Sequence, residues 1–135
     1  MLKCVKNNAL ATEPQTIGEH IKQKRLRGEL TQKQAGLIMA VDPYTVLNWE
    51  KSKTTPSPTD LPGIIRFLGH IPLPQPVTLA ERLYYLRCIR GWSIKNASRA
   101  AGIHEETWGY WERGQNLPQK RMRERIEKFL SSCAI

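Results

Sequence analysis

"LTQKQAGLIMAVDPYTVLNWEKSK", residues 30–53, contains two short stretches of helical periodicity with a break between them. Thr31 is a natural N-cap for the first helix, because its hydroxyl can accept a hydrogen bond from a free backbone N–H of the first turn. Asp42 can cap the second helix in the same way. Pro43 follows it at the first helical position, where a missing N–H does no harm. The stretch therefore predicts two short helices joined by a tight turn at residues 40–41.

Each predicted helix has an inward side. We expect it to consist of Ala35, Ile38 and Met39 in the first helix, and of Val46 and Trp49 in the second. By the geometry of 3.6 residues per turn, the second helix then has a common outward side formed by Pro43, Tyr44, Leu47, Asn48 and Lys51. This side carries a tyrosine, a leucine and an amide in place of the usual glutamates and lysines. Such a face on a short helix suits the DNA major groove.

The same pattern occurs twice in the chain. Shifted by 62 residues, residues 16–68 align without a gap with residues 78–130, and twelve aligned pairs are identical. Identical pairs include Glu19/Glu81, Ala35/Ala97, Thr45/Thr107, Trp49/Trp111 and Pro56/Pro118. Self-similarity at a fixed period indicates the duplication of one structural unit.

The duplication predicts an all-α fold of two tandem units, each of about four helices. Unit 1 covers residues 16–68 and unit 2 covers residues 78–131. Between them, "GHIPLPQPV", residues 69–77, contains three prolines and predicts a stiff, extended linker. Residues 1–15 have no helical period and predict a flexible tail.

Within the units, the remaining helices follow from the same signals. In unit 1 a first helix begins at Ile17, and "GIIRFLG", residues 63–69, forms a closing helix after a loop. In unit 2 we expect helices over 79–90, from a cap at Ser93 to a turn at Gly102, over 105–113 and over 119–130.

The composition is basic in both units. Lys and Arg number 21 against 12 Asp and Glu, which gives a formal net charge of +9. Residues 1–74 carry 10 basic and 6 acidic side chains, and residues 75–135 carry 11 and 6, so the net charges are +4 and +5. This balance favours a polyanionic partner through counterion release. On charge alone, a cationic protein without such a partner remains an alternative.

Other features exclude several classes of protein. Cys4, Cys88 and Cys133 are an odd number without CxxC spacing, so neither a disulfide framework nor a zinc site is indicated, and Cys88 lies on an apolar helix stripe. We find no signal peptide and no membrane-spanning run, which predicts a cytoplasmic protein with no membrane partner. No catalytic set of side chains is present either. We therefore expect no enzyme activity, no metal and no cofactor.

Residues 30–53 resemble the helix-turn-helix of the lambda-repressor-like, Cro-type (Xre) DNA-binding family. The residues that match its pattern in register are Leu30, Thr31, Gln32, Val41, Thr45, Trp49 and Glu50. The resemblance extends over residues 16–68 and again over 78–130. Unit 1 departs from the pattern at Gly36, where Ala is usual, and at Ala40, where the turn is usually Gly. An L-residue in a left-handed turn costs about 1 kcal/mol, so we expect these two changes to weaken the helix pair.

The resemblance implies site residues for unit 1. Base edges would be contacted from the start of the second helix and one turn later, by Pro43, Tyr44, Leu47 and Asn48. Asn48 could bond adenine through its amide, and Tyr44 and Leu47 could pack on thymine methyls. Phosphates would be contacted from the start of the preceding helix and from the loop after Trp49, by Gln32, Lys33, Lys51, Lys53 and Thr54.

Unit 2 keeps Trp111 and Glu112 but departs at the corresponding face. Ile94 replaces Gln32, and the helix begins with Glu105 and Glu106. These carboxylates oppose phosphates, although Glu can accept a hydrogen bond from cytosine and also complements the helix dipole. By resemblance, Glu106 and Tyr110 are candidates for base contacts, and Lys95, Arg113 and Gln115 for phosphate contacts.

Several conspicuous residues are interpreted as structural. We expect Trp92 and Trp108 to pack in the core, although an exposed Trp108 would indicate an interface. Glu50 and Glu112 each follow a tryptophan at a helix end, which favours a hydrogen bond or salt bridge within the unit over acid–base chemistry. "KRMRERIEK", residues 120–128, is interpreted as the solvated face of the last helix, although contact with DNA is an alternative.

The sequence therefore predicts a sequence-specific double-stranded DNA-binding protein, of the bacterial or phage transcriptional regulator type. The alternative is a DNA-binding antitoxin or adaptor in which only unit 1 contacts DNA. Unit 2 would then form a homodimer or bind a protein partner. Glu105, Glu106 and Ile94 favour this second interpretation.

Overall fold

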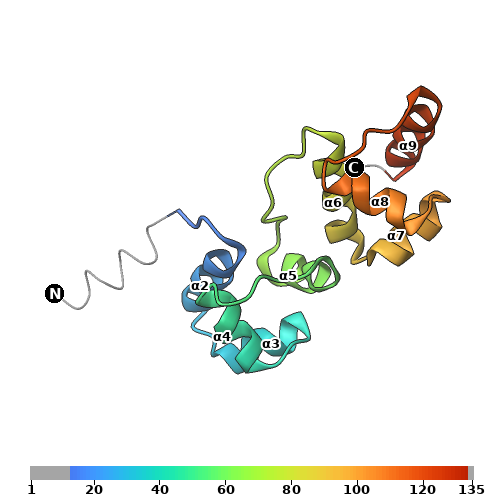
Figure 1. The fold of residues 1–135 in the computed structure, drawn as a ribbon. Helices are drawn as coiled ribbons and strands as arrows, with labels where there is room; N and C mark the ends of the chain where they lie inside the picture. The colour runs from blue at the N-terminus through green and yellow to red at the C-terminus, as the bar shows by residue number, and fades with distance from the viewer. Residues whose placement is uncertain (1–12, 134–135) are drawn as a thin grey trace. The chain divides into compact units, whose positions relative to one another are not determined.

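The computed structural model describes residues 13–133, and this part of the chain is helical and contains no strand (Figure 1). The all-α prediction is thus confirmed. The chain divides into two compact units, residues 1–73 and 74–135, and this division falls inside the segment 69–77. Of the predicted tail, residues 1–12 lie outside the described residues.

Between residues 13 and 73, unit 1 contains four α-helices and one short 3₁₀ turn. The helices are α2 (Ile17–Arg27), α3 (Gln32–Met39), α4 (Pro43–Glu50) and α5 (Leu61–Leu68), with η1 (Pro58–Asp60) before α5. The prediction for the closing helix was wrong at its start, which lies two residues before Gly63. Pro58 and Pro62 each stand in the first turn of a helical element, where no backbone N–H is needed. The two prolines therefore favour the start of a helix in a segment that was expected to be a loop.

The caps at the start of α3 and α4 are those predicted. Thr31 and Gln34 form a capping box, in which each backbone N–H donates to the other residue's side chain, at 2.8 Å and 3.1 Å. The carboxylate of Asp42 accepts a hydrogen bond of 2.8 Å from the N–H of Thr45, and Pro43 follows it as the first helical residue. Both helix starts are therefore fixed by local hydrogen bonds, independently of tertiary packing.

The core of unit 1 draws side chains from all four α-helices. Val46 and Trp49 are buried on α4, as predicted. The buried apolar residues of this unit are Ile21, Ala35, Met39, Val46, Trp49, Leu61, Ile64, Phe67 and Leu68. Since α4 contributes only one side of a two-turn helix to this core, its other side is left outside it.

The inward side of α3 differs from the prediction. Ile38 is 42% exposed, and the buried residues of α3 are Ala35, Gly36 and Met39. A Cβ at Gly36 would lie 2.6 Å from the carbonyl oxygen of Val41, so the glycine allows the turn to pack directly on the helix. This close approach places Gly36 on the buried side and leaves Ile38 outside it. The expectation that Gly36 weakens the helix pair was wrong, because any side chain there would clash.

The turn residue Ala40 has the left-handed conformation that its position requires, with φ of 63°. In unit 2 the aligned residue is Gly102, with φ of 70°, as the sequence predicted. Gly adopts this conformation without the Cβ penalty, which is about 1 kcal/mol for Ala. The turn of unit 1 is thus the more strained of the two.

Unit 2, as far as it is described (residues 74–133), has four α-helices in the same order. They are α6 (Leu79–Arg90), α7 (Ile94–Ala101), α8 (Glu105–Glu112) and α9 (Lys120–Ser132). Ser93 caps α7, as predicted, by accepting a hydrogen bond of 3.1 Å from the N–H of Asn96. At the start of α8 the Nδ1 of His104 accepts one of 3.3 Å from the N–H of Glu106. His104 therefore takes the place that Asp42 has in unit 1.

The core of unit 2 contains two of its three tryptophans. Trp108 is fully buried and Trp111 nearly so, and Trp92 packs against the same cluster. The predicted packing roles of Trp92 and Trp108 are confirmed, which removes Trp108 as the marker of an interface. Cys88 is buried, as predicted, and its burial raises the pKa of the thiol to about 11. No helix within residues 13–133 combines the length and apolarity required to cross a membrane.

Candidate nucleic-acid interface

Helix α4 has two different sides. Val46 and Trp49 anchor one side in the core, with exposed fractions of 0% and 4%. On the other side Tyr44 is 70% exposed, Pro43 is exposed, and Leu47 and Asn48 are half-buried. The side chains predicted to contact bases therefore share the accessible side of one helix. The half-burial of Leu47 and Asn48 restricts their side chains, so that Tyr44 is the most prominent group of the four.

An ion pair fixes the end of α4 to α2. The guanidinium of Arg25 makes two hydrogen bonds to the carboxylate of Glu50, from Nε at 2.8 Å and from Nη2 at 2.9 Å. The Glu50 side chain is 4% exposed and that of Arg25 14% exposed. Arg25 also donates to the carbonyl of Leu30 at 3.1 Å. One guanidinium thus connects the end of α4 with the segment before α3.

Unit 2 contains the same device at the aligned positions. Arg87 pairs with Glu112 and donates to the carbonyl of Trp92 at 3.3 Å. Glu112 also accepts a hydrogen bond of 2.7 Å from the indole Nε1 of Trp108. The predicted bond or salt bridge within the unit is thereby confirmed for both Glu50 and Glu112.

The partners of these glutamates, Arg25 and Arg87, were not identified from the sequence. They are one of the twelve identical pairs of the repeat, which was a usable signal. An arginine and a glutamate are both retained in the two copies of the repeat. Opposite charges that are retained together can pair with each other inside the unit. The two retained charges together predict the ion pair.

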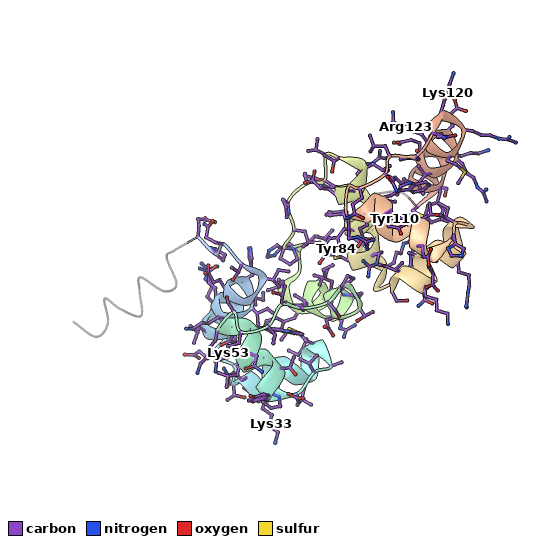
Figure 2. The ribbon with its side chains drawn as sticks, viewed as in Figure 1. Lys33, Lys53, Tyr84, Tyr110, Lys120 and Arg123 are labelled. Carbon is purple, nitrogen blue, oxygen red and sulfur yellow. The ribbon has the colours of Figure 1, made fainter. Side chains whose placement is uncertain are left out.

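The predicted phosphate contacts of unit 1 divide into two groups. Gln32 is partly buried, and its side-chain nitrogen donates to Glu50 at 3.3 Å, so in this structure its amide belongs to the ion-pair cluster. The second group is exposed and consists of Lys33, Lys51, Lys53 and Thr54. Figure 2 labels Lys33 and Lys53 on unit 1 and shows the Lys33 side chain pointing away from the helices. The exposed cations thus lie at the start of α3 and just after α4.

The chain after α4 is held close to the helix end. The N–H of Lys53 donates to the carbonyl of Asn48 at 2.9 Å, and Ser52 has a left-handed φ of 59°. This turn follows directly on the end of α4. It brings Lys51 and Lys53 to the helix that carries Tyr44 and Asn48.

The corresponding surface of unit 2 has a different character. Glu105 and Glu106 are exposed at the start of α8, and Tyr110 is 41% exposed. The guanidinium of Arg113 lies over the Tyr110 ring, 5.3 Å from its centroid. Of the other predicted phosphate contacts, Lys95 and Gln115 are exposed.

A hollow of about 360 Å³ opens on this surface of unit 2. Its lining combines the apolar side chain of Ile94 and the ring of Tyr110 with charged groups, and it consists of Ile94, Glu105, Glu106, Gly109, Tyr110 and Arg113. Gly109 aligns with Leu47 of unit 1. The hollow thus lies where unit 2 lacks the leucine side chain that unit 1 carries. With two carboxylates and one guanidinium, its formal charge is −1.

The described part of the chain contains no group of three or more His, Cys, Asp or Glu that could hold a metal ion. His20 and His70 lie close together, with ring centroids 5.3 Å apart. The pKa of His20 is lowered by burial and by the neighbouring His70.

Comparison of the chain with protein-family models, with curated proteins and with solved structures gives no match.

Proposed function

We propose that unit 1 binds double-stranded DNA by inserting the outward side of α4 into the major groove. The observation that supports this most strongly is Tyr44, a large aromatic residue that is 70% exposed and lies opposite the buried Trp49. An amide and an aliphatic side chain accompany it on the same side, and exposed lysines follow in the next turn. Base contacts would come from Pro43, Tyr44, Leu47 and Asn48.

Charge supports the same proposal. Within α4 the only acidic residue is Glu50, and it is buried in the pair with Arg25. Lys33, Lys51 and Lys53 are exposed around the helix. A phosphate backbone that approaches α4 therefore meets these cations, and the one exposed carboxylate at the start of the helix, that of the cap residue Asp42, accepts a hydrogen bond from the N–H of Thr45. The protein would act as a transcriptional regulator of the bacterial or phage type, with phosphate contacts from the exposed Lys33, Lys51, Lys53 and Thr54.

The proposal can be tested by selecting bound duplexes from a random-sequence pool and measuring affinities at several salt concentrations. We expect Asn48→Ala to lower the affinity for the selected duplex by about 1–3 kcal/mol, because the amide reads a base edge. On random DNA the loss should be small, since that binding depends on phosphates. A matched control is Lys53→Ala, which should weaken binding to both duplexes and reduce the salt dependence. Equal losses on both duplexes for Asn48→Ala would refute its base-reading role.

A second function, contact with a protein, is favoured for unit 2. If unit 2 read DNA as proposed for unit 1, Glu106 and Tyr110 would contact bases, and Lys95, Arg113 and Gln115 would contact phosphates. The exposed Glu105 and Glu106 oppose phosphates, however, and Gly109 stands where unit 1 has Leu47, one of its proposed base contacts. In the same binding assay, Tyr110→Ala separates the two possibilities. A tenfold loss of affinity for the selected duplex supports DNA reading by unit 2, whereas an unchanged affinity supports the protein contact.

A further inference from the structure

The hollow of unit 2 has the features of a receptor for a segment that is both apolar and cationic. Ile94 and Tyr110 supply apolar surface, and the carboxylates of Glu105 and Glu106 are exposed beside it. The side chain of Arg113 remains on the ring of Tyr110, so one negative charge is left over. An occupant would need an aliphatic side chain to pack on Ile94 and Tyr110, and at least one cation for the carboxylates.

This chain presents such a segment on its own surface. Leu117, in the loop before α9, is 69% exposed, whereas Pro118 beside it is buried and fixes the loop. Lys120 and Arg121 follow in the first turn of α9, and both are exposed. Figure 2 shows Lys120 extending outward at the start of that helix. An exposed leucine followed at three and four residues by two cations therefore complements the apolar residues and the carboxylates of the hollow.

The segment does not fill the hollow of its own chain. None of residues 117–121 lines the hollow, and Lys120 and Tyr110 lie well apart in Figure 2. The three basic residues in the first turn of α9, Lys120, Arg121 and Arg123, also stand at the positive end of the helix dipole. An acidic partner would relieve this unfavourable arrangement.

We propose that the hollow of unit 2 receives Leu117, Lys120 and Arg121 of a second copy of this chain. The contact is reciprocal, so that each copy offers one hollow and one segment, which gives a closed twofold dimer. The two surfaces are complementary in charge, the hollow at −1 and the segment at +2. This inference does not depend on DNA binding by unit 1, and either proposal can fail without the other.

The test is sedimentation of the full chain at about 0.15 M salt, where the repulsion between two basic chains is screened beyond about 8 Å. Each contact joins a short segment to a small hollow, so the interface belongs to the small, weak class. We therefore expect dimers to form at a protein concentration on the order of 100 µM or below. Two variants carry opposite charge reversals. The first is Glu105→Lys with Glu106→Lys, and the second is Lys120→Glu with Arg121→Glu.

Each variant alone should dimerise at least about tenfold more weakly than the natural chain, because its hollow and its segment now carry charges of the same sign. An equimolar mixture of the two should dimerise again, since both contacts of the mixed dimer then join opposite charges. A chain that stays monomeric at about 300 µM would overturn the proposal. So would variants that dimerise like the natural chain, or a mixture that stays monomeric.

Two further measurements guard against misfolding. Helix content by circular dichroism should be unchanged in all variants. Glu105→Gln with Glu106→Gln keeps the shape of the hollow and avoids cations at the start of α8. This variant should also form a weaker dimer. A dimer affinity equal to that of the natural chain would contradict the role of the carboxylates.

Discussion

Gly18→Ala is expected to destabilise unit 1 by about 3 kcal/mol or more, the upper part of the range for overpacking in a core. A Cβ at this position would lie 1.8 Å from the carbonyl oxygen of Trp49 and 2.6 Å from its carbonyl carbon. Both are backbone atoms, so no side chain can move aside. Helix α2 would have to shift away from the end of α4, which would also disturb the pair between Arg25 and Glu50.

Unit 2 supplies the control for this substitution. The residue aligned with Gly18 is Ala80, so the same helix position accepts a methyl group there. Ala80→Gly should lower stability only by about 0.5–1 kcal/mol, the usual effect of glycine in a helix. Hydrogen exchange of the amides of α2, α3 and α4, measured separately from those of unit 2, reports the loss in unit 1. Protection unchanged by Gly18→Ala would contradict the close approach of α2 to α4.

The second large effect is expected from Glu50→Ala, with a loss of about 3 kcal/mol of stability in unit 1. The substitution leaves the guanidinium of Arg25, 14% exposed, without its carboxylate. It also removes the acceptor for the side chain of Gln32. Since a buried charge without a partner is the main source of the loss, adding Arg25→Met should recover a large part of it.

Glu127→Ala is the matched control for Glu50→Ala. Glu127 pairs with Arg82 at 2.7 Å, but its side chain is 45% exposed and that of Arg82 28% exposed. Solvent screens this pair, and its removal should lower stability by less than about 1 kcal/mol. Urea unfolding of the two variants gives the comparison. If Glu50→Ala is no more destabilising than Glu127→Ala, the ion pair between α2 and α4 is not a structural anchor.

Much of the fold follows from local signals in the sequence. Thr31, Asp42 and Ser93 cap the helices that they were expected to cap, because capping needs only a side chain and the next three residues. Val46 and Trp49 are buried because their spacing places them on one side of a short helix. The duplication adds a second reading of each position, and the helices of both units occur in the same order.

The errors arise where backbone approaches backbone. Periodicity treated Ile38 as inward because it is apolar, yet the glycine at position 36 decides which side of α3 meets the turn. The contact between Gly18 and Trp49 is likewise invisible in a pattern of apolar side chains. The hollow of unit 2 depends on Gly109, whereas the sequence drew attention only to the residues around it that carry side chains. In each case a glycine, which has no side chain, allows a close backbone contact or leaves a space.

The candidate site of unit 1 was predictable in its position. Tyr44 lies on the accessible side of α4 because Trp49 occupies the other side, and both residues are in the quoted stretch of sequence. The orientation of Gln32 was not predictable, since its amide competes between solvent, phosphate and Glu50, and only the ion-pair cluster decides it. DNA binding by this surface remains a proposal.

The most direct test of the central proposal is to follow the backbone amide resonances of the full chain while the selected duplex is added. If the outward side of α4 enters the groove, the largest shifts should fall within residues 44–54 and at the start of α3, near Lys33. The amide resonances of α5, whose apolar side chains lie in the core, should shift little. The largest shifts in α5, with residues 44–54 unchanged, would contradict the account.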